Sequence, residues 1–271
     1  MRNAGEGLMR KKWVLYIILI SIICFYFSSQ VLADYSNEKF SWSFNSAKNN
    51  QPSTTEPHYQ ELLKKYGGFY IGDTSKKEVY LTFDNGYENG YTETVLNVLK
   101  EKDVPAAFFV TGHYLQTEQG LVNRMVDEGH IVGNHSFHHP SLPEVSDERF
   151  VRELESLKSL YEEVTGSKDM RYLRPPQGTF SERSLAKSEE LGYTNVFWSF
   201  AYKDWIIQEQ KGWKYAYDSV MNKIHPGAVM LLHSVSSDNA EALPKIIEEL
   251  ESQGYTFKSL DDLIIKKGFL E

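Results

Sequence analysis

The stretch from Glu78 to Gly86 reads Glu-Val-Tyr-Leu-Thr-Phe-Asp-Asn-Gly, an apolar run that ends in a polar turn. We expect a strand over residues 79–83, because the β-branched and aromatic side chains in this run favour extended backbone. Through the rest of the chain, short runs of this kind alternate with longer runs of helical periodicity. Alternating β and α units predict a parallel sheet covered by helices.

About seven such units follow one another in roughly 190 residues, which favours a distorted (β/α) barrel of parallel strands, closed or nearly closed. An open doubly wound sheet is the alternative, but no Gly-x-Gly-x-x-Gly motif follows a predicted strand to support it. The strands are expected at residues 79–83, 106–110, 131–134, 171–174, 194–198, 228–232 and 255–258. The helices between them are expected at residues 92–102, 120–128, 147–165, 181–191, 215–224 and 240–253.

The N-terminal residues have the pattern of an export signal. Three basic residues at 10–12 precede an apolar run over 13–27, and Ala33 closes a motif typical of a cleavage site. We expect residues 1–33 to be a cleaved signal or an uncleaved membrane anchor, and either would carry the rest of the chain out of the cytoplasm. Residues 34–75 are predicted to be an N-terminal arm, with a tether or loosely packed segment at residues 34–57 and a short helix at about residues 59–65, and residues 76–265 are predicted to be the main domain.

Composition limits the classes of protein that this chain can belong to. The 271 residues carry a formal net charge of −8, which disfavours a nucleic-acid-binding protein, because such proteins need a basic surface. The single cysteine, Cys24, lies inside the predicted export segment. A disulfide framework and a cysteine zinc site are therefore excluded.

Polar residues follow several of the predicted strands. In a parallel barrel the C-terminal ends of the strands meet at one rim, where the chemistry takes place. We therefore expect these side chains to lie close together. They are Asp84, Asn85, His135, His139, Arg174, Asp204 and His233.

His135 and His139 are four residues apart, and Pro140 follows them. This spacing predicts a helical turn from which both imidazoles reach one metal ion. The other interpretation is a pair of surface or capping histidines, which the neighbouring strand-end residues disfavour. His138 is expected to point elsewhere. Asn85 offers an amide oxygen, which is a weaker ligand for a divalent ion than a carboxylate.

The remaining candidates suit proton transfer and its support. Asp84 is a candidate general base, or a turn-forming residue before Asn-Gly. His233 can move protons near neutral pH, or can be a capped core histidine. Two prolines hold Arg174 in a fixed direction, which suits a buried acid partner or a surface salt bridge. Asp204 can orient a histidine, and Trp205 belongs to an aromatic segment that suits either a sugar groove or the core.

Five ordered motifs in this chain resemble those of the polysaccharide deacetylases, carbohydrate esterase family 4, which share the NodB-homology domain. The motifs span about residues 76–265 and lie at residues 82–86 (Thr-Phe-Asp-Asn-Gly), 135–140 (His-Ser-Phe-His-His-Pro), 174–178 (Arg-Pro-Pro-Gln-Gly), 204–205 (Asp-Trp) and 231–233 (Leu-Leu-His). The resemblance implies a distorted (β/α) barrel. It also implies metal-dependent removal of acetyl groups from N-acetylated sugars, or from acetylated xylan in some members.

The resemblance implies a role for each matching residue. Asp84 would be the base that activates water, with Arg174 orienting it. His233 would protonate the leaving amine and would be tuned by Asp204. Further residues would bind the substrate: the backbone N–H of Gln177 at the oxyanion, and the side chains of Trp205 and Leu231 around the acetyl methyl group.

The metal site departs from the family pattern at one position. His135 and His139 would hold a divalent ion such as zinc, but Asn85 stands where the family has a second aspartate as third ligand. Asn85, the following Tyr-Glu-Asn-Gly at residues 87–90 and the export signal resemble the branch of δ-lactam-biosynthetic de-N-acetylases. That branch acts on N-acetylmuramic acid of peptidoglycan during spore cortex formation, so the implied partner is a peptidoglycan glycan strand.

Three other functions stay open on the sequence alone. One is a deacetylase of another substrate: N-acetylglucosamine in peptidoglycan, chitin oligomers or a xylan ester. Another is a non-catalytic glycan-binding wall protein whose metal site has decayed, as Asn85 would suggest. The third is a purely structural exported barrel, which leaves the paired histidines and the ordered acids unexplained.

Overall fold

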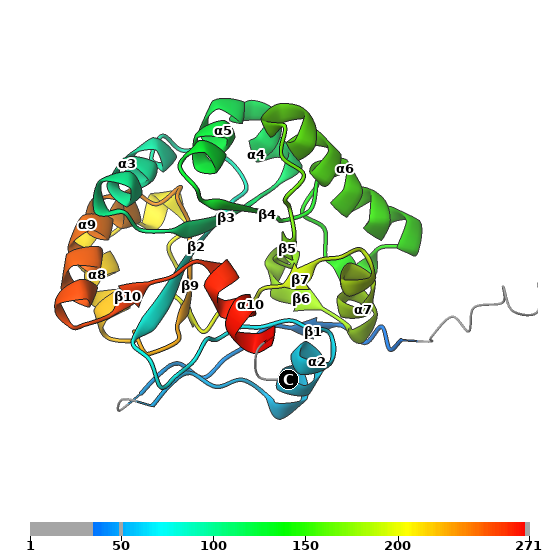
Figure 1. Cartoon of the computed structure of the whole chain (residues 1–271), viewed down its shortest axis with the longest axis horizontal. Coiled ribbons are helices and arrows are strands. Elements are labelled where there is room, and N and C mark those ends of the chain that lie inside the picture. Colours follow the sequence, from blue (N-terminus) through cyan, green and yellow to red (C-terminus); the bar gives the residue numbers. More distant parts are fainter. Residues whose placement is uncertain (1–34, 49–50, 269–271) are drawn as a thin grey trace, which may run out of the picture. The chain divides into compact units, whose positions relative to one another are not determined.

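The computed structural model describes residues 35–48 and 51–268, and the predicted export signal lies outside them. The described residues from 36 onward belong to one compact unit, in which a curled sheet is surrounded by helices (Figure 1). Within the described part of the chain, no helix is long and apolar enough to cross a membrane.

The main sheet confirms the predicted barrel of parallel strands. Among the described residues it has eight strands, in the order β7-β5-β4-β3-β2-β9-β8, with β10 paired to β2. Every pairing in it is parallel, and the sheet stays open between its edge strands β7 and β8. The strands are β2 (Glu78–Asn85), β3 (Ala106–Val110), β4 (Ile131–Asn134), β5 (Tyr172–Leu173), β7 (Thr194–Asn195), β8 (Phe200–Ala201), β9 (Val229–Leu232) and β10 (Thr256–Phe257).

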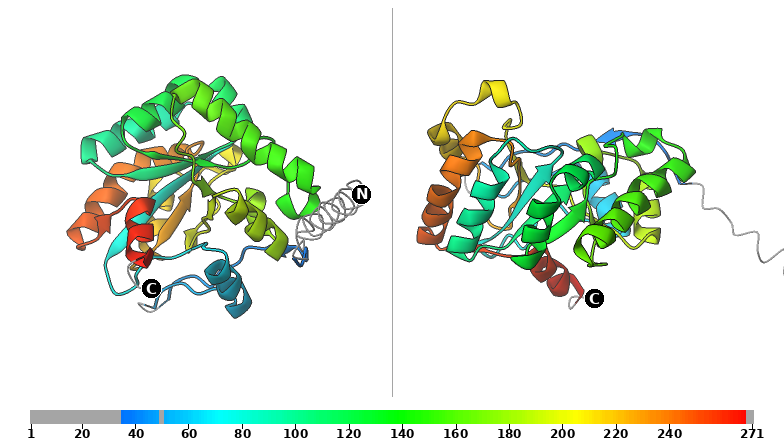
Figure 2. Two further views of the ribbon diagram at one scale, coloured as in Figure 1. Left: turned by 45° about the vertical axis from the view of Figure 1, so that its right-hand side comes forward. Right: turned by 90° about the horizontal axis from the view of Figure 1, so that it is seen from above.

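Helices follow the strands and pack on the convex side of the sheet, as two further views show (Figure 2). They are α3 (Thr92–Lys102), α4 (Gly112–Thr117), α5 (Gln119–Asp127), α6 (Asp147–Thr165), α7 (Glu182–Glu190), α8 (Trp213–Met221) and α9 (Ser237–Ser252). Before the barrel come β1 (Phe40–Ser41) and α2 (Pro57–Lys65), and α10 (Leu260–Gly268) ends the described chain. Short 3₁₀ turns lie at Leu142–Glu144, Pro176–Gly178 and Ile207–Glu209.

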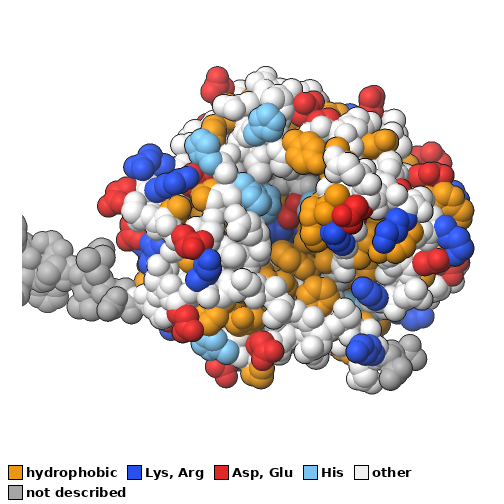
Figure 3. Space-filling view, turned by 180° about the vertical axis from the view of Figure 1, so that it is seen from behind, with side chains coloured by type: hydrophobic (Ala, Val, Ile, Leu, Met, Phe, Trp, Pro, Cys, Tyr) orange, Lys and Arg blue, Asp and Glu red, His pale blue; other side chains and the backbone are white. Residues whose placement is uncertain are grey.

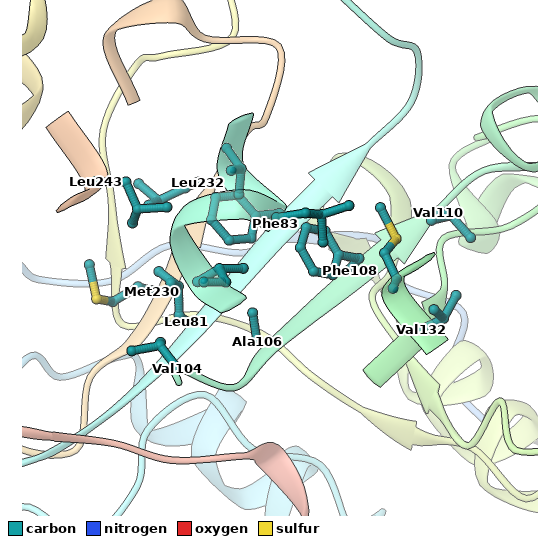
Figure 4. Close-up of a cluster of buried hydrophobic side chains, with 14 of the residues drawn as sticks. Leu81, Phe83, Val104, Ala106, Phe108, Val110, Val132, Met230, Leu232 and Leu243 are labelled. Carbon is teal, nitrogen blue, oxygen red and sulfur yellow. The ribbon is translucent and has the colours of Figure 1, made fainter. Parts of the chain in front are cut away.

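Alternate residues of the strands face two separate cores. Toward the helices, Leu81, Phe83 and Phe108 belong to the larger core, and the two phenylalanine rings stack with centroids 5.1 Å apart (Figure 4). On the concave side, Tyr80 belongs to a second core that Leu260 of α10 joins. Because side chains alternate along a strand, the residues that follow Tyr80 on the concave face are Thr82 and Asp84.

The arm before the barrel packs against it, so the expectation of a loosely packed arm is wrong. Trp42 is buried, and its ring lies 4.5 Å from that of Phe197. The indole N–H of Trp42 donates to the carbonyl oxygen of Trp198 at 3.0 Å, and the backbone N–H of Trp42 donates to the carbonyl oxygen of Gly178 at 2.8 Å. β1 also pairs with β6 (Thr179–Phe180). The prediction rested on the polar composition of the arm and did not take account of the few aromatic side chains that anchor it.

Candidate active site

Asp84 and Arg174 form a buried ion pair inside the rim of the barrel. Arg174 Nη1 lies 2.7 Å from Asp84 Oδ1 and 2.8 Å from Thr82 Oγ1, which extends the concave face of β2. Arg174 is fully buried, and its guanidinium carbon sits 4.1 Å from the centroid of the Phe109 ring. Because strand, aromatic ring and hydroxyl all restrain the guanidinium, the carboxylate of Asp84 has a fixed direction.

The charges around Asp84 keep it ionised. Burial alone would raise its pKa, but the Arg174 guanidinium holds the pKa of this carboxyl below its ordinary value. The second oxygen, Oδ2, lies 3.5 Å from His135 Nε2. Asp84 therefore combines an ionised carboxylate with one oxygen that is not used by Arg174, as a general base requires.

The segment from His135 to His139 is a loop after β4, so the expected helical turn is wrong. Ser136 and His139 have left-handed backbone, with φ of 62° and 58°. Two hydrogen bonds impose this shape: the Ser136 N–H donates to Asn134 Oδ1 at 2.8 Å, and the His139 N–H donates to Ser136 Oγ at 2.9 Å. The loop nevertheless brings the rings of His135 and His139 together, with their Nε2 atoms 3.2 Å apart.

One hydrogen bond fixes the tautomer of His135. Its Nδ1 lies 2.7 Å from the carbonyl oxygen of Arg174, which can only accept, so Nδ1 carries the proton. The lone pair is then on Nε2, the nitrogen that faces His139 and Asp84. Burial lowers the pKa of His135 to about 4 and also lowers that of His139, so both imidazoles are neutral at physiological pH.

This arrangement fits a divalent metal ion through two ligands. Two nitrogens bound to one tetrahedral ion at about 2.05 Å lie roughly 3.3 Å apart, and the Nε2 atoms of His135 and His139 are 3.2 Å apart. Within the described residues, no group of three or more histidine, cysteine, aspartate or glutamate side chains is arranged to hold a metal. One carboxylate oxygen, Asp84 Oδ2, lies 3.5 Å from His135 Nε2. Asn85, the predicted third ligand, is not among the residues that line the cavity, and its buried Oδ1 accepts no hydrogen bond from the described residues.

Replacing His139 with alanine is expected to weaken divalent-ion binding by at least about 100-fold, because it removes one of two imidazole ligands. Titration calorimetry of the purified protein with zinc chloride measures the affinity. His138→Ala is the matched control, since that side chain is 69% exposed and its Nδ1 lies 3.1 Å from Glu153 Oε1. Equal affinities for the two variants would show that the histidine pair is not the metal site.

His233 lies across the rim and is held by Asp204. His233 Nδ1 is 2.7 Å from Asp204 Oδ1, and the backbone N–H of His233 donates to Oδ2 at 2.8 Å. Asn239 Nδ2 also donates to Oδ2, at 2.6 Å, which holds the carboxylate in place. Burial alone would lower the pKa of His233, but the charge and hydrogen bond of Asp204, with Asp84, raise it above the ordinary value. His233 is therefore suited to give a proton near neutral pH.

Asp84 and His233 line one cavity of about 660 Å³, together with His135, His139 and Trp205. Figure 3 looks onto a hollow in which histidine side chains gather along one side and hydrophobic side chains along the other.

Two predicted substrate-binding residues, Gln177 and Leu231, are not among those that line the cavity. Gln177 lies beside it, with its side-chain amide 3.4 Å from the carbonyl of His139 and φ of 60°. Leu231 is buried within β9. The structure thus brings the other polar candidates to one rim and leaves these two, together with Asn85, out of the cavity lining.

Several residues that support the site were given no role from the sequence. Thr82, Phe109 and Asn239 each contact a predicted site residue, but Thr82 was quoted only as part of the first motif, and Phe109 and Asn239 are ordinary strand and helix residues by local pattern. Thr82 alone had a usable signal, because a residue two before Asp84 on the same strand shares its face. The contacts of Phe109 and Asn239 come from neighbouring elements and depend on the complete fold.

Residues 71–196 match the family model described as polysaccharide deacetylase. The chain is 49% identical to peptidoglycan-N-acetylmuramic acid deacetylase PdaA of Bacillus subtilis, over 94% of this chain and 97% of the relative. The solved structure of B. subtilis PdaA, described as a family 4 carbohydrate esterase, matches with a TM-score of 0.84 and 52% identity, covering 86% and 99% of the two chains. A peptidoglycan-N-acetylglucosamine deacetylase of Bacillus cereus is 31% identical over 74% of this chain and 73% of the relative.

Proposed function

The chain belongs to the polysaccharide deacetylase family, carbohydrate esterase family 4, and from this premise we propose that it hydrolyses the N-acetyl group of N-acetylmuramic acid in peptidoglycan. The observation that carries the proposal is the shared cavity of Asp84 and His233, with an ionised carboxylate on one side and an imidazole on the other. The 49% identity to a deacetylase named for N-acetylmuramic acid favours that sugar over N-acetylglucosamine.

Hydrolysis of an amide needs a nucleophile, stabilisation of the oxyanion and a proton for the leaving amine. Asp84 takes a proton from the attacking water through Oδ2, while Arg174 holds Oδ1 and keeps the carboxylate ionised. We assign the oxyanion to the backbone N–H of Gln177, as the resemblance to the family implies; the side-chain amide of this residue lies 3.4 Å from the carbonyl oxygen of His139. When bound between His135 and His139, a divalent ion would polarise the carbonyl and acidify the water.

The amine leaves on the opposite side of the cavity. Asp204 accepts the Nδ1–H of His233, so the proton that can be delivered is on Nε2 of the imidazolium. Trp205, whose ring centroid is 5.5 Å from that of His233, offers an apolar wall for the sugar or its acetyl methyl group. Cleavage of the C–N bond releases acetate and leaves a free amine on the muramic acid residue.

The product amine lies on the same sugar as a lactyl carboxylate, so the two can condense to a δ-lactam, the modification typical of spore cortex. We place this reaction outside the cytoplasm, on the cell wall, because the substrate is there and because residues 1–33 have the pattern of an export signal or anchor.

The test is mass spectrometry of defined glycans after incubation with the purified protein. We expect loss of acetyl groups from muramic acid residues of a peptide-free glycan strand, with a matching release of acetate. Strands that keep their stem peptides, N-acetylglucosamine oligomers and acetylated xylan are the other substrates. Acetate released from N-acetylglucosamine alone would contradict the proposed sugar, and no acetate from any substrate would favour a non-catalytic glycan-binding protein.

A further inference from the structure

A buried chain of hydrogen bonds links Asn85, beside the base Asp84, to Glu88. Asn85 Nδ2 lies 2.7 Å from Ser234 Oγ, Ser234 Oγ lies 2.8 Å from Thr92 Oγ1, and Thr92 Oγ1 lies 2.5 Å from Glu88 Oε2. The side chains of Asn85, Thr92 and Ser234 are fully buried. We refer to these four residues as the Glu88 chain.

Glu88 is ionised, because five donors point at its carboxylate. The backbone N–H groups of Gly90, Tyr91 and Thr92 donate to Oε1, at 2.6, 2.9 and 3.2 Å. The hydroxyls of Thr92 and Tyr114 donate to Oε2. Burial alone would raise the pKa of Glu88, but these hydrogen bonds lower it below the ordinary value.

The ionised carboxylate sets the direction of every proton in the Glu88 chain. A carboxylate can only accept, so Thr92 gives its one hydroxyl proton to Glu88. Thr92 must then accept from Ser234, and Ser234 in turn must accept from position 85. Position 85 must therefore supply a hydrogen-bond donor to Ser234 Oγ, and the NH₂ group of Asn85 does so.

An aspartate at position 85 would be incompatible with this direction. Its carboxylate would take the hydroxyl proton of Ser234, so Ser234 could no longer donate to Thr92 while Thr92 donates to Glu88. The hydrogen bond between the two hydroxyls would be lost, and a charge would be buried at a position that now holds an uncharged amide, which is costly. The neutral residue at position 85 and the acid at position 88 are therefore complementary.

We propose that Glu88 is a positioning residue that, through Thr92 and Ser234, selects an uncharged amide at position 85 and couples the loop of the base Asp84 to the loop of the acid His233. Ser234 directly follows His233 in the chain, and Asn89 makes a second link between the loops by donating to the carbonyl of Val235 at 2.9 Å. The arrangement gives the NH₂ group of Asn85 to Ser234 and leaves Oδ1 without a partner among the described residues.

The first test measures thermal unfolding of Asn85→Asp, Glu88→Gln and the double variant. Asn85→Asp is expected to lower the midpoint by about 5–10 °C when Glu88 is present. In the Glu88→Gln background it is expected to change the midpoint by less than about 3 °C, because glutamine can donate and the whole chain can reverse. Asn97→Asp on the exposed face of α3 is the control, and it should have the same effect in both backgrounds.

An equal cost of Asn85→Asp in both backgrounds would overturn the proposal. A single variant that fails to fold beside a double variant that folds would support it. This test needs no activity, so it reports on the Glu88 chain even if the proposed function is wrong.

The second test measures coupling to catalysis and rests on the proposed function. Thr92→Val removes the hydroxyl at nearly constant shape and is expected to lower kcat by about 10-fold or more, with KM within about 2-fold, because the acid and base loops lose a link. Thr92→Ser restores the hydroxyl and is expected to recover most of the lost kcat. A wild-type kcat in Thr92→Val, or equal losses of kcat in Thr92→Val and Thr92→Ser, would contradict the positioning role. If neither protein that carries Asn85→Asp folds, the two Thr92 variants decide the question.

Discussion

Replacing Asp84 with asparagine is expected to lower kcat for acetate release by about 10³-fold or more. The amide keeps the shape of the side chain but cannot take a proton from water. Arg174 then loses the charge that balances it in a fully buried place, so the free energy of unfolding should also fall, by about 3 kcal/mol. The assay measures acetate from muramyl glycan well below the unfolding midpoint of the variant.

Two measurements separate loss of the base from loss of the fold. Circular dichroism at the assay temperature should match the wild type, and the substrate dissociation constant should change little, since Asp84 acts on water rather than on the sugar. An aryl acetate has a leaving group that needs no protonation. Asp84→Asn should lose the same factor in its rate, relative to wild type, on this ester as on the amide. Near-normal turnover of folded Asp84→Asn would remove this residue from the mechanism.

Replacing His233 with alanine is expected to lower kcat on muramyl glycan by about 10²- to 10⁴-fold. An amine is a poor leaving group unless it is protonated, and His233 is the raised-pKa imidazole that faces the cavity. The fold should tolerate this change, because Asp204 keeps its hydrogen bonds from the backbone N–H of residue 233 and from Asn239.

The aryl acetate distinguishes the acid from the base. With that substrate the loss in His233→Ala should shrink to below about 10-fold, whereas the loss in Asp84→Asn should persist. Added imidazole is expected to restore part of the activity on the glycan. An equal loss on amide and ester would mean that His233 does not protonate the leaving group.

Local signals in the sequence determine much of the fold. The helix predicted at residues 147–165 is present with those bounds, because Ser146 caps its start by accepting from the N–H of Arg149 and Gly166 ends it with a φ of 71°. The predicted strand at residues 106–110 is likewise present as β3, as a run of buried apolar residues. Capping residues and apolar runs are properties of neighbouring residues, which the sequence displays directly.

Strands whose pairing depends on distant partners were predicted less well. The run expected at residues 194–198 pairs with β5 over only two residues, and Val196 then bridges to Phe69 from the segment before the barrel. The strand expected at residues 171–174 is short as well, since Pro175 and Pro176 cannot donate to a ladder. The sequence does not show which distant segment takes over the pairing.

In the candidate site, too, some contacts could be predicted from the sequence and others could not. The meeting of Asp84, Arg174 and His135 follows from the topology of a parallel barrel, whose strand ends share a rim. The left-handed turn of the histidine loop and the contact between Asn85 and Ser234 do not follow from it, because they depend on side-chain hydrogen bonds. Asn85 and Ser234 are 149 residues apart, so no spacing rule relates them.

The central claim is that an ionised Asp84 and a protonated His233 act together on one acetamide, and the pH dependence of kcat/KM tests it most directly. Activity should fall as the pH rises through the pKa of His233, which Asp204 holds above its ordinary value. Asp204→Asn removes that charge, so the alkaline limb should move to lower pH while the acidic limb stays in place. The claim would be contradicted if Asp204→Asn is folded and the alkaline limb of its kcat/KM profile lies at the same pH as that of the wild type.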